Sequence, residues 1–139
     1  MTAARWWHFE HAADIGVAGE GATLAEAYEQ AAHALVAVVT DAPIETRERY
    51  SYHCDAPNAE LLFVDWLNAL IYDMATRRVL FAQFDVTTDG RHLDAVVGGE
   101  PIDRARHRPA VEIKGATYTA LSVRQTPQGR WRAQCVVDV

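Results

Sequence analysis

The sequence predicts an α+β domain in which two helices pack on one face of a mostly antiparallel β-sheet. Two observations carry this prediction. Apolar residues recur with the spacing of a helix in residues 24–39 and 58–76. After Arg78 the pattern changes to the period of two that is typical of strands, and glycine-containing turns separate the runs. Helices followed by hairpin-linked strands are typical of folds in which helices cover one face of an antiparallel sheet.

Length and composition predict a single domain over residues 1–139. The chain has 139 residues, of which 50% are hydrophobic, and single domains commonly contain about 100–150 residues. A chain of this length buries enough apolar surface to fold without disulfides or a structural metal. Any bound metal is therefore expected to serve function.

Both expected helices carry terminal signals. Thr23 stands three residues before Glu26, the spacing of a capping box. The second helix has Glu60 near its start and Arg77 and Arg78 at its end, as the helix dipole favours. The apolar face of the first helix consists of Leu24, Ala27, Tyr28, Ala31, Leu35, Val38 and Val39. That of the second consists of Leu62, Phe63, Trp66, Leu67, Leu70, Ile71 and Met74.

Strands are expected before, between and after the helices, because alternating or β-branched residues predominate there. The expected segments are residues 5–9, 15–17, 50–55, 79–86, 93–97, 111–119, 121–125 and 131–137. Hairpin turns are predicted at Asp89-Gly90, Gly98-Gly99 and Pro127-Gln128-Gly129. Asp89-Gly90 is the strongest of these signals, because aspartate and glycine tolerate the positive φ of a tight turn.

The charge balance argues against direct binding to nucleic acid. Lys and Arg number 13 and Asp and Glu number 19, so the net charge is −6, and an acidic protein repels a phosphate backbone. The two cysteines are too few for a disulfide framework, and the sequence shows no signal peptide or long uncharged apolar run. We expect a cytoplasmic protein that does not contact membranes and exists as a monomer or weak oligomer.

Two aspartates and the C-terminus form the leading candidate metal site. Asp14 lies in a link between two apolar segments, and Asp138 is followed by Val139, whose α-carboxylate is a second anionic group. If the N-terminal and C-terminal strands are neighbours, Asp14 joins this cluster, and such oxygen ligands suit Ca²⁺ or Mg²⁺. The alternative is that Asp14 is an ordinary turn residue and the C-terminus is frayed.

A second metal hypothesis uses nitrogen and sulfur ligands. His8 and His11, together with Cys54 or Cys135, could form a zinc site. However, the sequence has no Cys-x-x-Cys pair, and a strand places His8 and His11 on opposite faces. The oxygen ligands are therefore favoured.

A basic cluster interrupts the acidic chain at Arg104, Arg106, His107 and Arg108. We expect an exposed loop there, in which Arg106 and His107 could contact a phosphate or an acidic partner surface. Lys114 lies within a predicted strand and should face solvent, unless neighbouring carboxylates draw it into an ion pair.

Several segments, in their order and spacing along nearly the whole chain, resemble the archease family. The opening block and the helices are matched by Glu10-His11-Ala12-Ala13-Asp14-Ile15-Gly16, Thr23-Leu24-Ala25-Glu26-Ala27-Tyr28, Thr40-Asp41 and Leu61-Leu62-Phe63-Val64-Asp65-Trp66-Leu67-Asn68. The later blocks are matched by Gly99-Glu100, Arg106-His107, Ile113-Lys114-Gly115-Ala116-Thr117-Tyr118 and Val137-Asp138-Val139.

The resemblance implies a small α+β accessory protein of the RtcB-type RNA ligase, which acts in tRNA splicing and RNA repair. Such proteins promote the metal- and GTP-dependent guanylylation of the ligase and its multiple turnover. By position, Asp14, Asp138 and Val139 are the implied ligands of a divalent cation, with calcium the leading expectation and magnesium or manganese the alternatives. Lys114 and His11 belong to the implied functional cluster near the metal. RNA would be reached only through the ligase.

Two positions depart from the family pattern. Ala12 replaces the threonine that usually follows the histidine of the first block, which removes a hydroxyl that could orient the loop. Ala120 stands where many members carry histidine or serine. Neither change removes an implied ligand.

Two other functions remain as alternatives to a non-catalytic ligase cofactor. A metal-dependent hydrolase or phosphotransferase would use the same carboxylates with His11 or His107 as general acid-base. The sequence shows no activated nucleophile for such a reaction. A general chaperone or modulator of nucleic-acid-modifying enzymes would act through a surface that the sequence does not identify.

Overall fold

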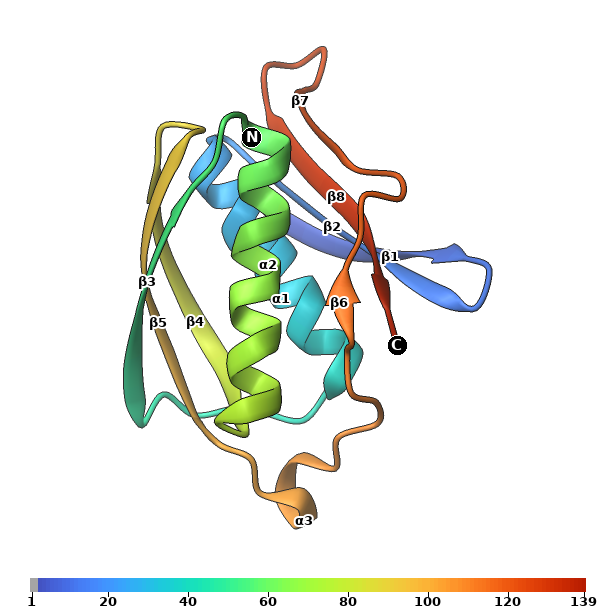
Figure 1. The fold of residues 1–139 in the computed structure, drawn as a ribbon, viewed down its shortest axis with the longest axis vertical. Coiled ribbons are helices and arrows are strands. Elements are labelled where there is room, and N and C mark those ends of the chain that lie inside the picture. Colours follow the sequence, from blue (N-terminus) through green and yellow to red (C-terminus); the bar gives the residue numbers. More distant parts are fainter. Residues whose placement is uncertain (1–2) are drawn as a thin grey trace.

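The computed structural model describes residues 3–139, whose strands form two antiparallel sheets (Figure 1). The first sheet contains strands from both ends of the chain. Its strands are β1 (Arg5–His11), β2 (Asp14–Gly21), β8 (Trp131–Asp138), β6 (Gly115–Ala116) and β7 (Ser122–Gln125). β2 lies between β1 and β8, while β6 and β7 pair with the opposite edge of β8.

The second sheet contains the middle of the chain. Its order is β3 (Glu48–Asp55), β5 (His92–Pro101) and β4 (Val79–Thr88). All strand pairs in both sheets are antiparallel within the described residues. The predicted α+β class is confirmed, but the strands form two sheets where one sheet was expected.

The two predicted helices are α1 (Leu24–Val39) and α2 (Ala59–Thr76). The Thr23 half of the predicted capping box is formed, because the Glu26 N–H donates to Thr23 Oγ1 at 3.1 Å. The Glu26 carboxylate accepts the N–H of Ala22, one residue before the cap, at 2.8 Å. Asn58 caps α2 by accepting the Leu61 N–H at 2.9 Å. Among the described residues, no helix is both long and apolar enough to cross a bilayer.

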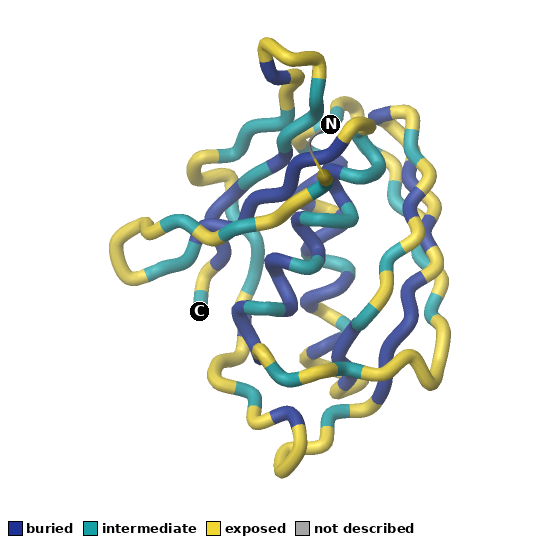
Figure 2. The backbone as a smooth tube through the Cα atoms, turned by 180° about the vertical axis from the view of Figure 1, so that it is seen from behind, coloured by how far each residue is buried: buried dark blue, intermediate teal, exposed yellow. Residues whose placement is uncertain are grey.

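The core lies where the helices meet both sheets. α1 packs against β2 and β8 of the first sheet and β4 of the second, and α2 also contacts strands of both. The fully buried Trp66 of α2 donates its Nε1–H to the Tyr28 carbonyl of α1 at 3.1 Å. Buried residues follow the helices and the strands around them, whereas exposed residues mark the hairpin tips (Figure 2). The helices thus tie the sheets into one structure.

The predicted turn at Gly98-Gly99 is wrong, because both glycines lie inside β5. They face an irregularity of β4 between Phe81 and Gln83, which is consistent with a β-bulge. A Cβ at Gly99 would collide with the Leu80 carbonyl oxygen. These glycines therefore allow close backbone approach, whereas the Asp89-Gly90 and Pro127-Gln128-Gly129 turns do connect adjacent strands.

The predicted strand at residues 111–119 is also largely wrong, since only Gly115 and Ala116 are in a strand. The flanking residues Lys114 and Thr117 still donate their N–H groups to β8, but other backbone groups of this part of the chain bond to the helices. The Ala110 N–H donates to the Val39 carbonyl at 2.7 Å, and the Ala116 N–H donates to the Asn68 side chain at 2.9 Å. The preceding basic segment forms a short helix, α3 (Arg104–His107), where a loop was expected.

Candidate functional site

The predicted ligands Asp14 and Asp138 lie in one row across the first sheet. His11 is paired with Asp14 between β1 and β2, and Asp138 is paired with Gly115 between β8 and β6. In the antiparallel pairing of β2 with β8, Ile15 lies opposite Val137. Continuing this register by one residue brings Asp14 opposite Asp138. Residues opposite each other in a sheet direct their side chains to the same face. His11, Asp14 and Asp138 therefore share a face.

Val139 completes this group. Its N–H donates to Asp14 Oδ1 at 3.4 Å, which brings the last residue beside the first aspartate of the site. The Val139 side chain packs against the hydrophobic core. The apolar side chain thus anchors Val139, and the backbone N–H of this residue lies beside the Asp14 carboxylate.

Lys114 adjoins the same row through its backbone. Its N–H donates to the Asp138 carbonyl at 2.8 Å. Its side chain is exposed and makes no ion pair within 4.0 Å in residues 3–139. The ammonium group is therefore free to meet a carboxylate or a partner.

The sequence reasoning missed the role of Asn68, which appeared there only as part of a family block. Asn68 lies on α2, and its side-chain oxygen accepts the Ala116 N–H at 2.9 Å. Thr117 adds a second anchor, because its hydroxyl donates to the Val136 carbonyl at 2.8 Å. The available signal was an amide side chain at a half-buried position next to the apolar stripe of α2. Together these bonds fix the segment that carries Lys114.

The donor set fits a hard divalent cation but is incomplete on its own. Asp14, Asp138 and the Val139 carboxylate offer anionic oxygens, the ligands that Ca²⁺ and Mg²⁺ prefer. Among the described residues, no group of three or more His, Cys, Asp or Glu side chains is arranged to hold a metal. The set therefore depends on the terminal carboxylate, and its remaining ligands would have to be backbone oxygens, water or groups from a partner.

The alternative zinc ligands are dispersed. The His8 ring donates from Nε2 to the Ala34 carbonyl of α1 at 2.7 Å. Cys135 is buried in β8, where burial raises the pKa of its thiol to about 12, while Cys54 lies on β3 of the other sheet. Because zinc binds the thiolate, a buried thiol with a raised pKa is a poor ligand.

Arg106 and His107 belong to an internal ionic network centred on Glu100, whose side chain is 1% exposed. The Arg106 guanidinium donates to both Glu100 oxygens, at 3.0 and 2.5 Å, and the His107 Nε2–H donates to Oε2 at 3.1 Å. The Glu45 N–H donates to the same carboxylate at 2.7 Å. The hydrogen bonds from Arg106 are the main reason that the pKa of Glu100 lies well below its usual range, although burial opposes them.

This network changes what the basic cluster can do. The His107 side chain is 0% exposed, and its Nδ1 accepts the Asp103 N–H at 2.8 Å, so neither nitrogen faces solvent. Arg106 is 40% exposed and could still be touched by a partner. Figure 1 places α3 at the bottom of the molecule, whereas the β1–β2 hairpin projects from its side at mid-height. Arg106 and His107 are therefore not part of the Asp14 row.

Comparison with known proteins identifies relatives over the full length of the chain. The sequence pattern of the Archease protein family matches residues 6–139. The "Protein archease" of Pyrococcus abyssi is 35% identical over 140 residues, which are 97% of this chain and 99% of that protein. The protein of the same name from Thermococcus gammatolerans is 36% identical over the same shares.

Two solved structures have the same fold. The solution structure of Methanobacterium thermoautotrophicum protein 1598 covers 100% of both chains with a TM-score of 0.82 and 28% identity. The crystal structure of an archease from Thermotoga maritima, described as a possible chaperone, covers 94% of both chains with a TM-score of 0.59. At 19% identity, the second likeness concerns the fold alone.

Proposed function

This chain belongs to the archease family, and we propose that it is an accessory factor of an RtcB-type RNA ligase. In this proposal it promotes the metal- and GTP-dependent guanylylation of the ligase and its multiple turnover in tRNA splicing and RNA repair. The observation that carries the proposal is the row in which Asp14, Asp138 and the C-terminal residue come together. Residues from the two ends of the chain meet there, where β2 begins and β8 ends.

The proposed metal ligands are Asp14, Asp138 and the Val139 α-carboxylate. Carboxylates gathered at one site repel one another, so a divalent cation, with calcium the leading candidate, would stabilise such a cluster by neutralising it. The Val139 N–H orients Asp14 through its hydrogen bond. Lys114 would supply a further positive charge, and His11 lies in the same row.

We propose that the protein acts by contact with the ligase and does not catalyse a reaction of its own. The acidic row would dock near the metal- and nucleotide-binding centre of the ligase and favour the state competent for guanylylation, which requires tighter binding to that state. The net charge of −6 supports action on the enzyme, with the RNA left to the ligase. We place this activity in the cytoplasm.

The hydrolase alternative loses one of its candidate residues. His107 was a potential general acid-base, but its side chain is enclosed and hydrogen-bonded at both nitrogens. A general acid-base must reach the reacting group directly or through one water. His11 alone would have to serve that role.

A ligase guanylylation assay at limiting metal tests the proposal. Asp138→Asn, and separately a short extension after Val139, should each reduce activation by about tenfold or more if these groups hold the metal. Asp85→Asn is the matched control, because Asp85 is an exposed aspartate on β4 of the other sheet. Full activation by both site variants would contradict the assignment.

A chaperone or general modulator remains the second candidate, since the Thermotoga maritima archease is described as a possible chaperone. Capture of partners from the native cell extract separates the two functions. A single RNA ligase supports the leading proposal, whereas a broad set of nucleic-acid-modifying enzymes supports the second.

A further inference from the structure

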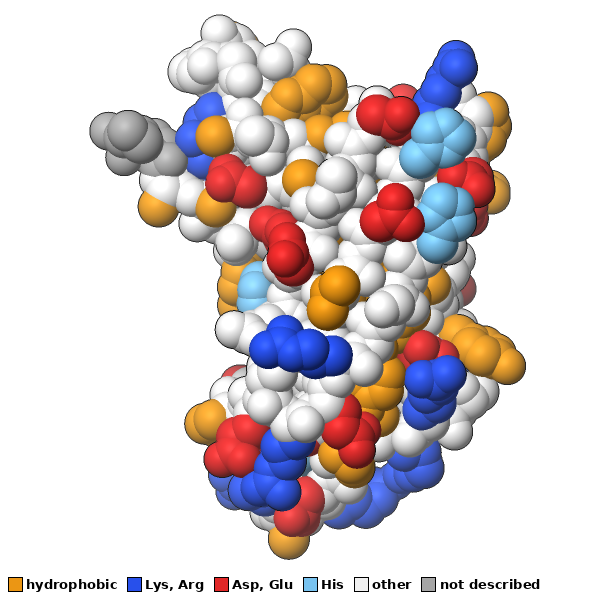
Figure 3. Space-filling model, turned by 90° about the vertical axis from the view of Figure 1, so that its left-hand side faces the viewer, with side chains coloured by type: hydrophobic (Ala, Val, Ile, Leu, Met, Phe, Trp, Pro, Cys, Tyr) orange, Lys and Arg blue, Asp and Glu red, His pale blue; other side chains and the backbone are white. Residues whose placement is uncertain are grey.

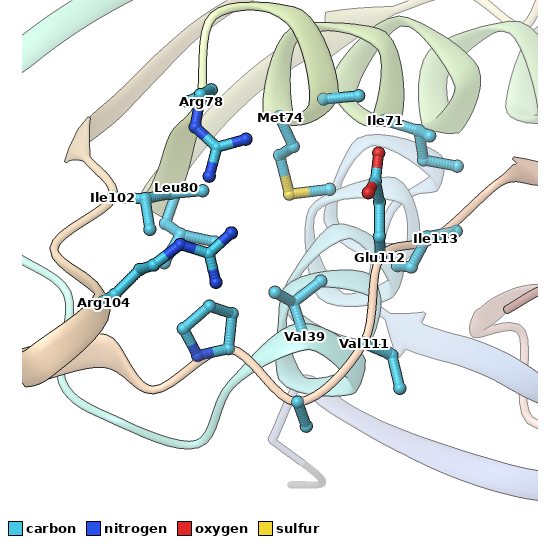
Figure 4. A pocket seen from close by; sticks show the side chains of 13 residues that line it. Val39, Ile71, Met74, Arg78, Leu80, Ile102, Arg104, Val111, Glu112 and Ile113 are labelled. Atoms are coloured by element: carbon cyan, nitrogen blue, oxygen red, sulfur yellow. The ribbon is translucent and has the colours of Figure 1, made fainter.

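A pocket of about 230 Å³ opens where the ends of α1 and α2 meet the segment formed by residues 102–113 (Figure 4). Its apolar lining includes Val39, Ile71, Met74, Leu80, Ile102 and Ile113. The charged residues Arg78, Arg104 and Glu112 also line the pocket. The pocket thus combines an apolar interior with a charged rim.

The two arginines form a positively charged wall. Figure 4 shows the guanidinium groups of Arg78 and Arg104 on one side of the pocket and the Glu112 carboxylate on the other. Within residues 3–139, neither guanidinium has a carboxylate within 4.0 Å. By contrast, Arg106 and Arg132 each pair with a buried glutamate. The donors of the pocket arginines are therefore available to a ligand.

The backbone at Arg78 is a second, independent observation. Arg78 has φ of 56° and directly follows Arg77, the C-cap of α2. Glycine is the usual residue at this position, because a side chain is disfavoured in the left-handed conformation. The chain nevertheless carries an arginine there, with its guanidinium at the pocket. Such strain is a recognised mark of functional positions.

We propose that this pocket binds a small organic anion with one charged end, either a carboxylate or a phosphate, and an apolar body. Arg78 and Arg104 would bind the anionic end with charge-assisted hydrogen bonds. The apolar lining would cover the body, and Glu112 would repel a second anionic group at the opposite wall. Sites for drug-sized ligands occupy roughly 300–1,000 Å³, so this pocket suits a smaller molecule.

Calorimetry or amide NMR titration of the full chain with four six-carbon probes tests the proposal. Hexanoate or hexyl phosphate should bind saturably, and the tighter of the two identifies the preferred anionic group. Neutral hexanol should bind about tenfold more weakly or worse, because it lacks the charge. Adipate should bind more weakly than hexanoate in the native protein, and Glu112→Gln should reduce this difference.

Variants of the arginines separate binding from folding. The double variant Arg78→Gln with Arg104→Gln should lose about tenfold or more in affinity for the preferred anion. Arg124→Gln, an exposed arginine on β7, is the matched control and should bind normally. Arg78→Gly should bind more weakly and yet unfold at a higher temperature, because glycine tolerates a φ of 56°.

The proposal is overturned if neither anion binds saturably, if hexanol binds as well as hexanoate, or if the double arginine variant keeps native affinity. These measurements contain no ligase and leave Asp14 and Asp138 intact. Their outcome therefore does not depend on the proposed function in RNA ligation.

Discussion

Asp14 is positioned by the backbone of Val139, the same residue whose carboxylate is proposed to share its metal. The Val139 N–H donates to Asp14 Oδ1 at 3.4 Å, and the valine side chain packs against the core. One residue therefore packs against the core and orients Asp14, and in the proposed site it would also supply a carboxylate. A residue added after Val139 would convert that carboxylate into a neutral amide carbonyl, which is why the C-terminal extension is a sharp test of the site.

The turn before Asp14 contains a strained residue. Ala12 has φ of 51° in the two-residue connection between His11 and Asp14. Ala12→Gly should raise the free energy of unfolding by about 0.5–1 kcal/mol, because glycine relieves the left-handed strain while adding freedom to the unfolded chain. Denaturant unfolding measures this change. The matched control is Ala13→Gly, which should destabilise because φ of Ala13 is not positive; equal losses in both variants would contradict the argument.

At the scale of elements, β6 is a two-residue strand that its surroundings hold in place. Its residues Gly115 and Ala116 pair with Asp138 and Val137 of β8, and Asn68 of α2 accepts the Ala116 N–H. Helix α2 therefore reaches the strand that stands beside the proposed metal ligands. Lys114, immediately before β6, depends on this attachment for its position.

Asn68→Ala tests the attachment. The variant leaves a half-buried N–H without its acceptor, so the free energy of unfolding should fall by about 1–2 kcal/mol. Hydrogen exchange at the Ala116 amide should accelerate more than exchange in β5. Gln30→Ala is the control, since it removes an amide from α1 that has no side-chain hydrogen bond to another described residue. Unchanged exchange at Ala116 would show that β8 alone holds β6.

At the scale of the whole molecule, charged groups of both signs make stability depend on pH. Hydrogen bonds from Arg132 and Arg106 lower the pKa values of the buried Glu20 and Glu100. On the outer face of the second sheet, the His53 ring lies 2.8 Å from both Asp94 and Asp55, and these contacts raise its pKa. Figure 3 shows histidines among acidic side chains on this face. The histidine contacts lie on the surface, whereas the two glutamates are enclosed.

Acid should destabilise the protein mainly through the two buried glutamates. Because their folded pKa values lie below the unfolded value of about 4.3, their contribution is present above that pH and is lost as pH falls through the folded values. Burial raises the pKa of Glu29, so the contribution of Glu29 to the acid dependence has the opposite sign. The contacts of His53 have the opposite pH dependence. Because they raise the pKa of His53, the stability that they contribute is lost as pH rises through that pKa.

Glu100→Gln tests the acid limb of this dependence. The free energy of unfolding near neutral pH should fall by about 1–3 kcal/mol, a range reduced from that of fully buried pairs because Arg106 is partly exposed. Its decline between about pH 5 and 3 should also be shallower than in the native protein. Denaturant titrations at several pH values measure both. Parallel pH profiles of the two proteins would contradict the role of Glu100.

Prediction from sequence succeeded where the signal is local. The spacing of apolar residues gave both helices, Thr23 and Glu26 marked the start of α1, and Asp89-Gly90 marked a hairpin turn. Prediction failed at Gly98-Gly99, because a glycine pair occurs both in turns and where two backbones approach closely. Only the position of the neighbouring strand β4 shows that the second case applies here. Residues 111–119 alternate like a strand, but only the part from Lys114 onward bonds to β8, and the Ala116 N–H bonds to the side chain of Asn68 on α2.

The sequence by itself determined the two helices, the cap of the first helix, the turns at Asp89-Gly90 and at residues 127–129, and the types of residue available as metal ligands. These features depend on a few neighbouring residues, so they are visible in a linear pattern. Only the tertiary structure decided that Asp14 meets Val139 across 125 positions of the chain, that Glu100 binds Arg106 and His107, and that two arginines face an apolar pocket. The physical reason is that strand register and core packing arise from contacts between distant segments, whose pairing no local period encodes.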